Sequence, residues 1–268
     1  MAAGKHIMGK ISNVWVFSDS ADRYADLLAG ARQLGEHVNA VIWDERDITE
    51  VKQADAVYLL CGKTDKQRVE NYAETLASLI GKEDGNTLIL LAATRRGKGV
   101  AAKLSVLLQA ALVNDVTRLE RNGDNLYAEH RMYGGLAFGR EKVNAPVAVI
   151  TLAGGVYEPL AEENAGTPPL TQVDYIPPAN EILCRERRSK TASCVDLGKA
   201  RRVIGIGRGL QAKEDLQMVW DLASALDAEV GCSRPIAEGE HWMDRERYVG
   251  VSGVLLKSDI YLALGISG

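Results

Sequence analysis

The chain has 268 residues, of which 46% are hydrophobic and 25% charged, and this is the composition of an ordinary globular protein. Its formal net charge of −4 gives no general attraction to nucleic acid or to anionic membranes. No apolar stretch approaches the ~20 residues that span a bilayer, which argues against membrane insertion. The length allows one large domain or two modest ones, each with a buried core.

The spacing of cysteines and histidines argues against a metal site. The four cysteines form no CxxC pair and the four histidines form no HxxxH pair, so neither structural zinc nor a disulfide framework is indicated. Reduced thiols of this kind are typical of a cytoplasmic protein. Residues 1–10 contain no apolar core of a secretory signal, and we expect them to be disordered.

The first half of the chain alternates short β-rich runs with helical patterns. Apolar residues recur at helical spacing over residues 23–35 and 69–80, and residues 94–108 are expected to form a loop and a helix. The run 87–93 is apolar nearly throughout, as in strands buried on both faces of a parallel sheet. This alternation predicts a doubly wound, mostly parallel sheet with strands at 14–17, 38–43, 56–60 and 87–93.

The pattern changes after Asn114. Glycine, asparagine and proline separate the β-like runs 116–120, 126–133, 141–143 and 146–152, which predicts hairpins added to the sheet. Residues 158–180 hold most of the chain's 7 prolines and are expected to be linker-like. We therefore predict an N-terminal α/β domain over residues 1–180 and a second domain over residues 181–268.

The second domain is expected to open with a strand–helix–strand unit over residues 202–232. Gly207-Arg208-Gly209 follows the first strand, where the glycines permit close backbone approach and the arginine can pair with a phosphate. The spacing matches GxGxxG imperfectly, because the third glycine comes one position early. Both a phosphate-binding turn and a purely structural turn therefore remain open.

Ser233-Arg234-Pro235 follows the next strand. In a nicotinamide-binding fold, the end of the second strand carries the residue that contacts the ribose, and Glu229 or Arg234 could fill that role. A solvated arginine in a turn is the alternative.

Two further glycine-bounded turns occur near the end of the sequence. Residues 249–253 offer one hydroxyl, from Ser252, and the apolar run 260–264 enters the turn 265–268. Apolar strands that enter such turns place bare backbone N–H groups at a phosphate. Three turns of this character predict a nucleotide site, although 249–253 alone would also suit a tight turn with an incidental serine.

The first domain offers one competing anion site at residues 94–98. Thr94-Arg95-Arg96-Gly97-Lys98 lies at the carboxyl end of the apolar strand, but the P-loop pattern GxxxxGK[ST] is absent. We favour a solvated basic face or a partner surface there. No Ser/His/Asp set, Cys/His pair or carboxylate dyad can be assembled from the chain.

Taken in order, the motifs GRG, SRP, GVSG and YLALGISG resemble those of the electron transfer flavoprotein alpha subunit, also called the FixB family. TRRGK after a buried strand, and Tyr133-Gly134-Gly135-Leu136-Ala137, agree with it. The resemblance covers nearly the whole chain and is strongest to the anaerobic enterobacterial branch associated with carnitine and fatty-acid metabolism. It implies a Rossmann-like FAD-binding second domain.

The resemblance also implies roles for individual residues. Arg208 with Gly207 and Gly209 would meet the FAD phosphates. Ser233 and Arg234 would lie against the flavin, with the guanidinium stabilising negative charge on the reduced ring. The remaining contacts would come from two loops: Val249, Gly250, Val251 and Ser252 under the ring, then Ser267 and Gly268 at the start of the next loop.

Two departures from the family pattern stand out. The family usually has Gln-Thr where this chain has Val251-Ser252, and the serine keeps a hydroxyl that can donate to flavin N5. The Gln-His, Asn-Lys-Asp and Ala-Asp-Tyr-Gly segments that follow GISG in the family are missing. We therefore expect a shortened chain whose FAD-binding domain is incomplete.

The family resemblance implies an electron carrier without its own substrate, rather than an enzyme. It would be a cytoplasmic heterodimer with a beta subunit, passing electrons through FAD between acyl-CoA dehydrogenases and a quinone- or ferredoxin-linked respiratory partner. Two alternatives are a nicotinamide-dependent oxidoreductase and a non-redox assembly subunit. Against the first, no Tyr-Lys pair or well-placed histidine follows the GIGRG turn.

Overall fold

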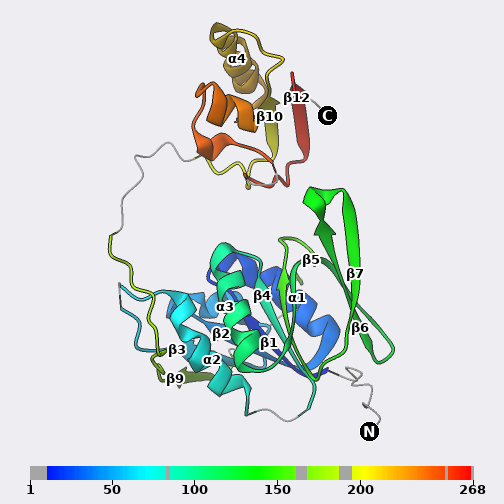
Figure 1. Cartoon of the computed structure of the whole chain (residues 1–268), viewed down its shortest axis with the longest axis vertical. Coiled ribbons are helices and arrows are strands. Elements are labelled where there is room, and N and C mark those ends of the chain that lie inside the picture. Colours follow the sequence, from blue (N-terminus) through cyan, green and yellow to red (C-terminus); the bar gives the residue numbers. More distant parts are fainter. Residues whose placement is uncertain are drawn as a thin grey trace. The chain divides into compact units, whose positions relative to one another are not determined.

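The computed structural model describes residues 11–64, 66–82, 85–160, 168–186, 195–250 and 253–266. The chain divides into two compact units, residues 1–187 and 188–268 (Figure 1). Within the described ranges, no helix is long and apolar enough to cross a bilayer. No cluster of three or more metal-ligating side chains occurs in the same ranges.

Unit 1, residues 1–187, is built on one nine-stranded sheet whose order is β7-β6-β5-β8-β4-β1-β2-β3-β9. Its central strands run parallel, and β4 is buried along its whole length. The strands are β1 (Ile11–Phe17), β2 (Gly35–Ile42), β3 (Ala56–Leu60), β4 (Thr87–Ala92), β5 (Ala111–Asn122), β6 (Asn125–Met132), β7 (Ala137–Val143), β8 (Val147–Leu152) and β9 (Leu170–Val173).

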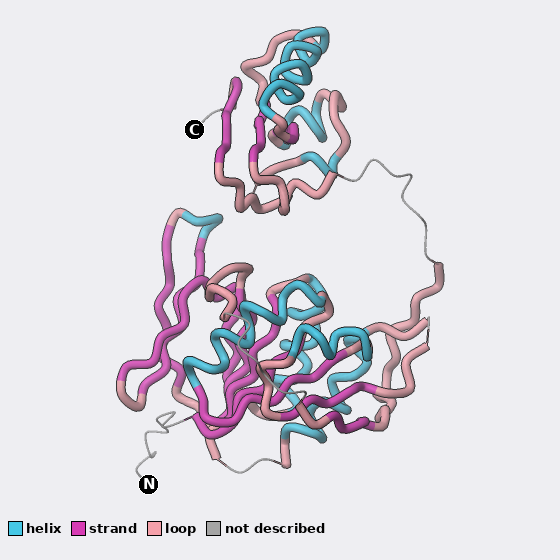
Figure 2. The backbone as a smooth tube through the Cα atoms, turned by 180° about the vertical axis from the view of Figure 1, so that it is seen from behind, coloured by secondary structure: helices cyan, strands magenta, loops and turns pink. Residues whose placement is uncertain are grey.

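Helices cover both faces of this sheet (Figure 2). Alternate residues of β1 divide between two buried clusters: Val14 packs with α1 (Tyr24–Leu34), and Trp15 packs with α2 (Ala73–Ile80) and α3 (Arg95–Leu107). Because successive side chains of a strand point to opposite faces, an apolar run such as β4 needs helices on both sides. The predicted doubly wound α/β fold is confirmed.

The hairpin region is smaller than the sequence pattern predicted. Among the described strands of this sheet, the antiparallel pairs are those of β6 with β5 and with β7. The run 146–152, also expected to belong to a hairpin, instead forms β8, which lies between β4 and β5 and runs parallel to both. Its residues Ala148, Val149 and Ile150 are fully buried, and this explains why a central position suits the strand.

The segment 158–180, expected to be a linker, contributes a strand. β9 lies at the edge of the sheet and pairs parallel with β3, beginning where the Pro169 carbonyl accepts a bond from Val57 N–H. Further along, the side chain of Asn71 bonds both backbone groups of Ile182, at 2.8 and 3.1 Å. Proline is tolerated at a strand's first residue and on sheet edges, so the proline count misled the prediction.

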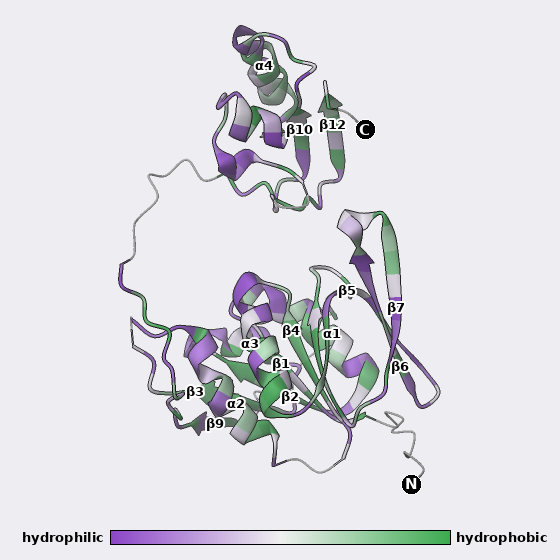
Figure 3. Ribbon diagram, viewed as in Figure 1, coloured by the Kyte–Doolittle hydropathy of each residue, from purple (hydrophilic) through white to green (hydrophobic). Residues whose placement is uncertain are grey.

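Unit 2, residues 188–268, holds a three-stranded parallel sheet of order β11-β10-β12. Its elements are β10 (Arg202–Ile206), α4 (Leu216–Leu226), β11 (Glu229–Cys232) and β12 (Ile260–Leu264). Its core is correspondingly small, and the sheet's apolar residues stand out in Figure 3. In α4 the buried residues are Leu216, Val219 and Ala223, whereas Leu222 and Leu226 are 37% and 44% exposed.

Candidate functional site at the carboxyl edge of unit 2

The parallel strands of unit 2 bring the predicted turns to one edge. Gly207 follows β10, Ser233 follows β11, and Gly265 follows β12. The loop that begins at Val249 joins the same edge, because Val249 N–H donates to the Cys232 carbonyl at 2.9 Å. Parallel strands end at a common edge, which is where open α/β sheets bind ligands.

Two of these turns pack directly against each other. Gly207 N–H donates to the Leu264 carbonyl and Gly209 N–H to the Gly265 carbonyl, both at 2.9 Å. A Cβ on Gly207 would lie 2.3 Å from the Gly265 carbonyl oxygen, and one on Gly209 would lie 2.5 Å from its Cα. The glycines therefore allow the turns to touch.

These bonds correct one sequence-based expectation. The N–H groups of Gly207 and Gly209 are not bare donors for a phosphate, because the neighbouring turn already accepts from them. Gly265 has a φ of +65°, a conformation that glycine adopts without strain. What the tight turn leaves facing outward is the intervening Arg208.

Arg208 is exposed, and it forms no ion pair or hydrogen bond with any residue in the described ranges. A guanidinium that is not already paired keeps its donors for an incoming anion, and its planar fork suits phosphate oxygens.

Ser233 provides the second available polar group. Its backbone is fully used: its N–H donates to the Ile206 carbonyl, and its own carbonyl accepts from Ile236 at 3.0 Å. Its hydroxyl oxygen is buried, yet it has no hydrogen-bond partner among the described residues. Buried polar atoms are rarely left unpartnered, so this hydroxyl marks a place where a further group would bind.

Arg234 forms an ion pair with Glu238, a residue that the sequence motifs did not single out. Its Nε donates to Oε2 of Glu238 at 2.6 Å, while Oε1 of Glu238 lies 3.4 Å from Nε of Arg245. The hydrogen bond from Arg234 holds the pKa of Glu238 below its ordinary value, so the carboxylate is charged at neutral pH. The i, i+4 spacing of Arg234 and Glu238 was a signal that could have identified the pair.

The loop after Val249 is tightly closed. Gly250, with a φ of +152°, accepts from Gly253 N–H at 2.9 Å, and Val254 N–H donates to the Tyr248 carbonyl at 2.8 Å. Of the residues predicted to hold a cofactor, Gly207, Arg208, Gly209, Ser233, Arg234, Val249 and Gly250 come together at this edge. Val251, Ser252, Ser267 and Gly268 lie outside the described residues.

One residue considered as a ribose contact lies at the wrong end of its strand for that role. Glu229 was considered as a ribose contact, but it is the first residue of β11, paired with Val203, and so lies at the amino end of the sheet. Its carboxylate is 3.7 Å from Nη1 of Arg247. The strand direction therefore removes Glu229 from the nucleotide site.

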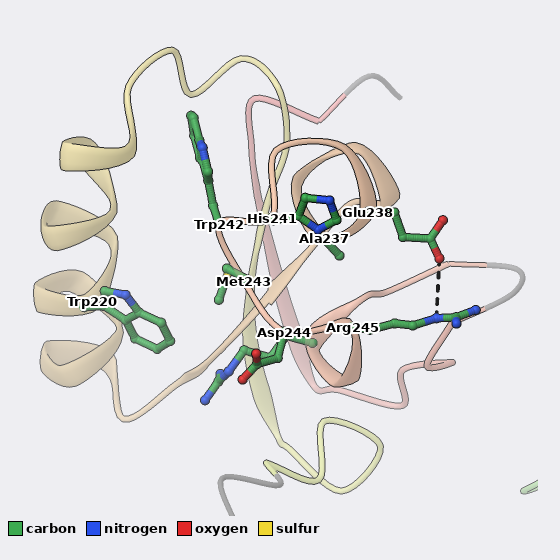
Figure 4. Close-up of a pocket in the computed structure, with 9 residues that line it drawn as sticks. Trp220, Ala237, Glu238, His241, Trp242, Met243, Asp244 and Arg245 are labelled. Atoms are coloured by element: carbon green, nitrogen blue, oxygen red, sulfur yellow. Dashed lines mark ion pairs between the residues drawn. The ribbon is translucent and has the colours of Figure 1, made fainter.

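A pocket of about 560 Å³ adjoins the Glu238 side of the site (Figure 4). Within it, the guanidinium of Arg247 lies 4.9 Å from the ring centre of Trp220 and donates to the Val230 carbonyl at 2.7 Å. The lining residues are Trp220, Ala237, Glu238, His241, Trp242, Met243, Asp244, Arg245 and Arg247. None of the described residues predicted to hold a cofactor is among them.

Cys232, at the end of β11, does not supply a nucleophile. Its side chain is buried, and burial raises the pKa of the thiol to about 11. The thiolate is the reactive form of cysteine, so the thiol is unreactive near neutral pH.

In the competing site of unit 1, the polar groups of Thr94 and Lys98 are already hydrogen-bonded or paired within the unit. Thr94 caps α3 by accepting from Gly97 N–H at 2.8 Å, and its hydroxyl donates to Asp19 at 2.5 Å. Lys98 pairs with Asp115 at 2.6 Å. Arg95 and Arg96 are exposed, and the carboxylate of Asp19 beside the helix N-terminus opposes an anion there.

The two units match two family descriptions. Residues 19–178 match the family described as Electron transfer flavoprotein domain. Residues 196–268 match the Electron transfer flavoprotein FAD-binding domain. The second match spans every turn of the site described above.

Comparison with individual proteins agrees with these matches. YdiR of Escherichia coli strain K12, provisionally named an electron transfer flavoprotein subunit, is 56% identical over 263 residues. Protein FixB of Salmonella typhimurium is 40% identical and that of Escherichia coli O7:K1 39% identical over the same length. In each case the match covers 97% of this chain and 84% of the relative. The chain therefore belongs to the electron transfer flavoprotein alpha-subunit family, whose members are electron-carrier flavoproteins.

Proposed function

We propose that this chain binds FAD at the carboxyl edge of unit 2 and works as the alpha subunit of a heterodimer with a beta subunit. It would carry electrons from acyl-CoA dehydrogenases, in fatty-acid or carnitine metabolism, to a quinone- or ferredoxin-linked partner. The observation that carries the proposal is that the Arg208 guanidinium and the buried Ser233 hydroxyl lie at one sheet edge, both without a hydrogen-bond partner among the described residues.

The residues present fit FAD. Arg208 offers a positive fork to the pyrophosphate, and the close packing of Gly207 against Gly265 keeps that arginine on a short, rigid turn. The Ser233 hydroxyl, which has no hydrogen-bond partner among the described residues, would find one in the flavin. Arg234, one residue further on, would place positive charge near the ring.

FAD supplies a ring that accepts two electrons and can release them one at a time. The protein's part is to bind, orient and tune this ring. The charge of Arg234 would favour the negatively charged reduced form, because a nearby opposite charge stabilises the charged state. Arg208 would orient the cofactor through its phosphates, and the 249–254 loop would shield one side of the ring.

A direct test is the absorption spectrum of the full chain, alone and co-expressed with a beta subunit, followed by titration with FAD and with a nicotinamide dinucleotide. We expect flavin bands, one FAD per chain, and reduction of the bound flavin by a reduced acyl-CoA dehydrogenase. Binding of the nicotinamide dinucleotide in place of FAD would overturn the proposal. Of the two residues considered as a nicotinamide ribose contact, Glu229 lies at the amino end of its strand, whereas Arg234 lies at the carboxyl edge, so the titration tests this alternative directly.

A further inference from the structure

The segment that carries Arg234 has an uncommon backbone. Residues Pro235–Gly239 form a single π-helical turn, in which Glu240 N–H donates to the Pro235 carbonyl at 2.9 Å. The π-helix is rare in proteins. Here the turn carries Glu238 back toward Arg234, so that the two side chains meet on the side that faces solvent.

The contact between these side chains uses only one edge of the arginine. Nε of Arg234 donates to Glu238, and neither terminal nitrogen of Arg234 bonds to any residue in the described ranges. A guanidinium has five N–H donors arranged around a plane. Holding it by Nε therefore fixes the direction of the plane while leaving the terminal donors available.

The exposure of the pair argues against a role in holding the fold together. The side chains of Arg234 and Glu238 are 66% and 31% exposed, and solvent-screened ion pairs of this kind contribute little to stability. Glu238 also lies near a second guanidinium, that of Arg245, on its other oxygen. One carboxylate is thus shared by two arginines, which limits its movement.

We propose that Glu238 is a positioning residue for Arg234: its carboxylate holds Nε so that the terminal nitrogens remain directed to the flavin. This inference rests on the proposed function, because it takes FAD to be the group that Arg234 meets. It assigns to the Glu238 carboxylate a part in setting the flavin potential without contact with the cofactor.

The variant that isolates positioning is Glu238→Asp. It keeps the negative charge but withdraws the carboxylate by one methylene, so any change in potential reflects the placement of Arg234 rather than lost charge. Glu240→Asp is the matched control, because Glu240 is an exposed acid two residues away. Glu238→Gln keeps an acceptor oxygen on a side chain of the same length, so it should preserve the hydrogen bond from Nε–H of Arg234.

The first measurement needs no cofactor. In the FAD-free full chain, NMR of arginine side chains should show a slowly exchanging Nε–H for Arg234. Glu238→Asp should remove its protection, and Glu240→Asp should leave it unchanged. Equal exchange in wild type and in Glu238→Asp would overturn the proposal, because the contact would then not hold Arg234 in solution.

The second measurement is the flavin midpoint potential in a double-mutant cycle. Glu238→Asp should lower it, in the direction of Arg234→Ala, with about a tenfold shift in the reduction equilibrium, which is about 30 mV for a two-electron couple. In an Arg234→Ala background, Glu238→Asp should change nothing. An equal shift in both backgrounds would show that Glu238 acts independently of Arg234 and would overturn the proposal.

The two failures can be told apart. A chain that takes up no FAD overturns the proposed function. If the chain binds FAD normally but Glu238→Asp leaves the flavin midpoint potential unchanged, only the role of Glu238 is overturned.

Discussion

The carboxyl edges of the two sheets differ in how the arginines Arg23 and Arg208 are engaged. In unit 1, Arg23 pairs with Asp26 at 3.1 Å and also donates to the carbonyls of Leu152 and Ala153, at 3.1 and 3.2 Å. Asp26 in turn accepts from Gly155 N–H at 3.0 Å. In unit 2, the corresponding edge leaves Arg208 unengaged among the described residues.

This difference distinguishes charged groups that stabilise the fold from charged groups that are available to bind a ligand. A buried charge must be paired, because removing it from water costs more than an unpaired group can recover. Arg23 is 17% exposed and Asp26 11%, and both are paired. Arg208 is exposed, so it can stay unpaired without that cost until an anion arrives.

The largest effect is expected where the turns of unit 2 touch. Gly207→Ala would put a Cβ 2.3 Å from the Gly265 carbonyl oxygen, so the two turns must separate. We expect unit 2 to lose about 3 kcal/mol of unfolding free energy, and FAD binding to fall with it. Urea denaturation followed by circular dichroism measures the first effect and flavin fluorescence the second.

The matched control for that change is Gly239→Ala, because a Cβ at Gly239 would meet nothing within 4 Å. If Gly207→Ala were as well tolerated as Gly239→Ala, the packing of the two turns would not shape the site.

In unit 1, Asp26→Asn tests whether the edge charges are structural. Loss of the carboxylate leaves Arg23 and Gly155 N–H short of a charged acceptor, at a cost of about 2 kcal/mol in the stability of unit 1. FAD affinity should not change. Asp124→Asn, at a side chain 78% exposed, is the control and should be silent in both assays.

For Arg208→Gln we expect the opposite result: FAD affinity falls while stability is kept. Stability should stay within about 0.5 kcal/mol, because the exposed side chain forms no ion pair or hydrogen bond with a described residue. FAD affinity should fall by about tenfold to a hundredfold, since a hydrogen bond to a charged group is worth about 1.5–3 kcal/mol. Isothermal titration of the FAD-free chain checks it.

The control for Arg208 is the double variant Arg95→Gln/Arg96→Gln in unit 1. It removes two exposed arginines from a helix N-terminus, and we expect it to leave FAD affinity unchanged. If the double variant lost FAD while Arg208→Gln kept its FAD affinity, the nucleotide site would lie in unit 1 and not in unit 2.

The smallest effect is expected at Ser233. In the FAD-free chain, Ser233→Ala removes a buried hydroxyl that has no described partner, so stability should be equal or slightly higher. FAD affinity should fall by roughly threefold to tenfold, equivalent to about 0.5–1.5 kcal/mol. Ser224→Ala, at an exposed position of α4, controls for serine removal. A fall in stability with no change in affinity would mean that the hydroxyl serves the fold.

Much of the local structure could be predicted from sequence. The bounds expected for β3, β10 and β12 match those observed, because each is a short β-rich run between turn residues. The meeting of the turns after β10, β11 and β12 was also predictable, since the carboxyl ends of parallel strands share an edge. The family resemblance added the residue-by-residue roles, which periodicity alone does not provide.

Other features depended on contacts between distant residues. The run 146–152 does not reveal that its strand lies between β4 and β5, and prolines concealed β9, because pairing partners are set by the whole sheet. The exposure of Leu222 and Leu226 follows from how narrow a core the three strands of unit 2 offer to α4.

The sequence by itself determined the fold class, the family and the positions of the glycine turns, because apolar periodicity and turn residues act locally along the chain. Only the tertiary structure decided which polar groups are free. The N–H groups of Gly207 and Gly209 are used by a turn more than fifty residues away, and Arg234 is held by a carboxylate that a π-helical turn brings back to it. Hydrogen bonds are satisfied in three dimensions, so which donors remain for a cofactor is settled by packing.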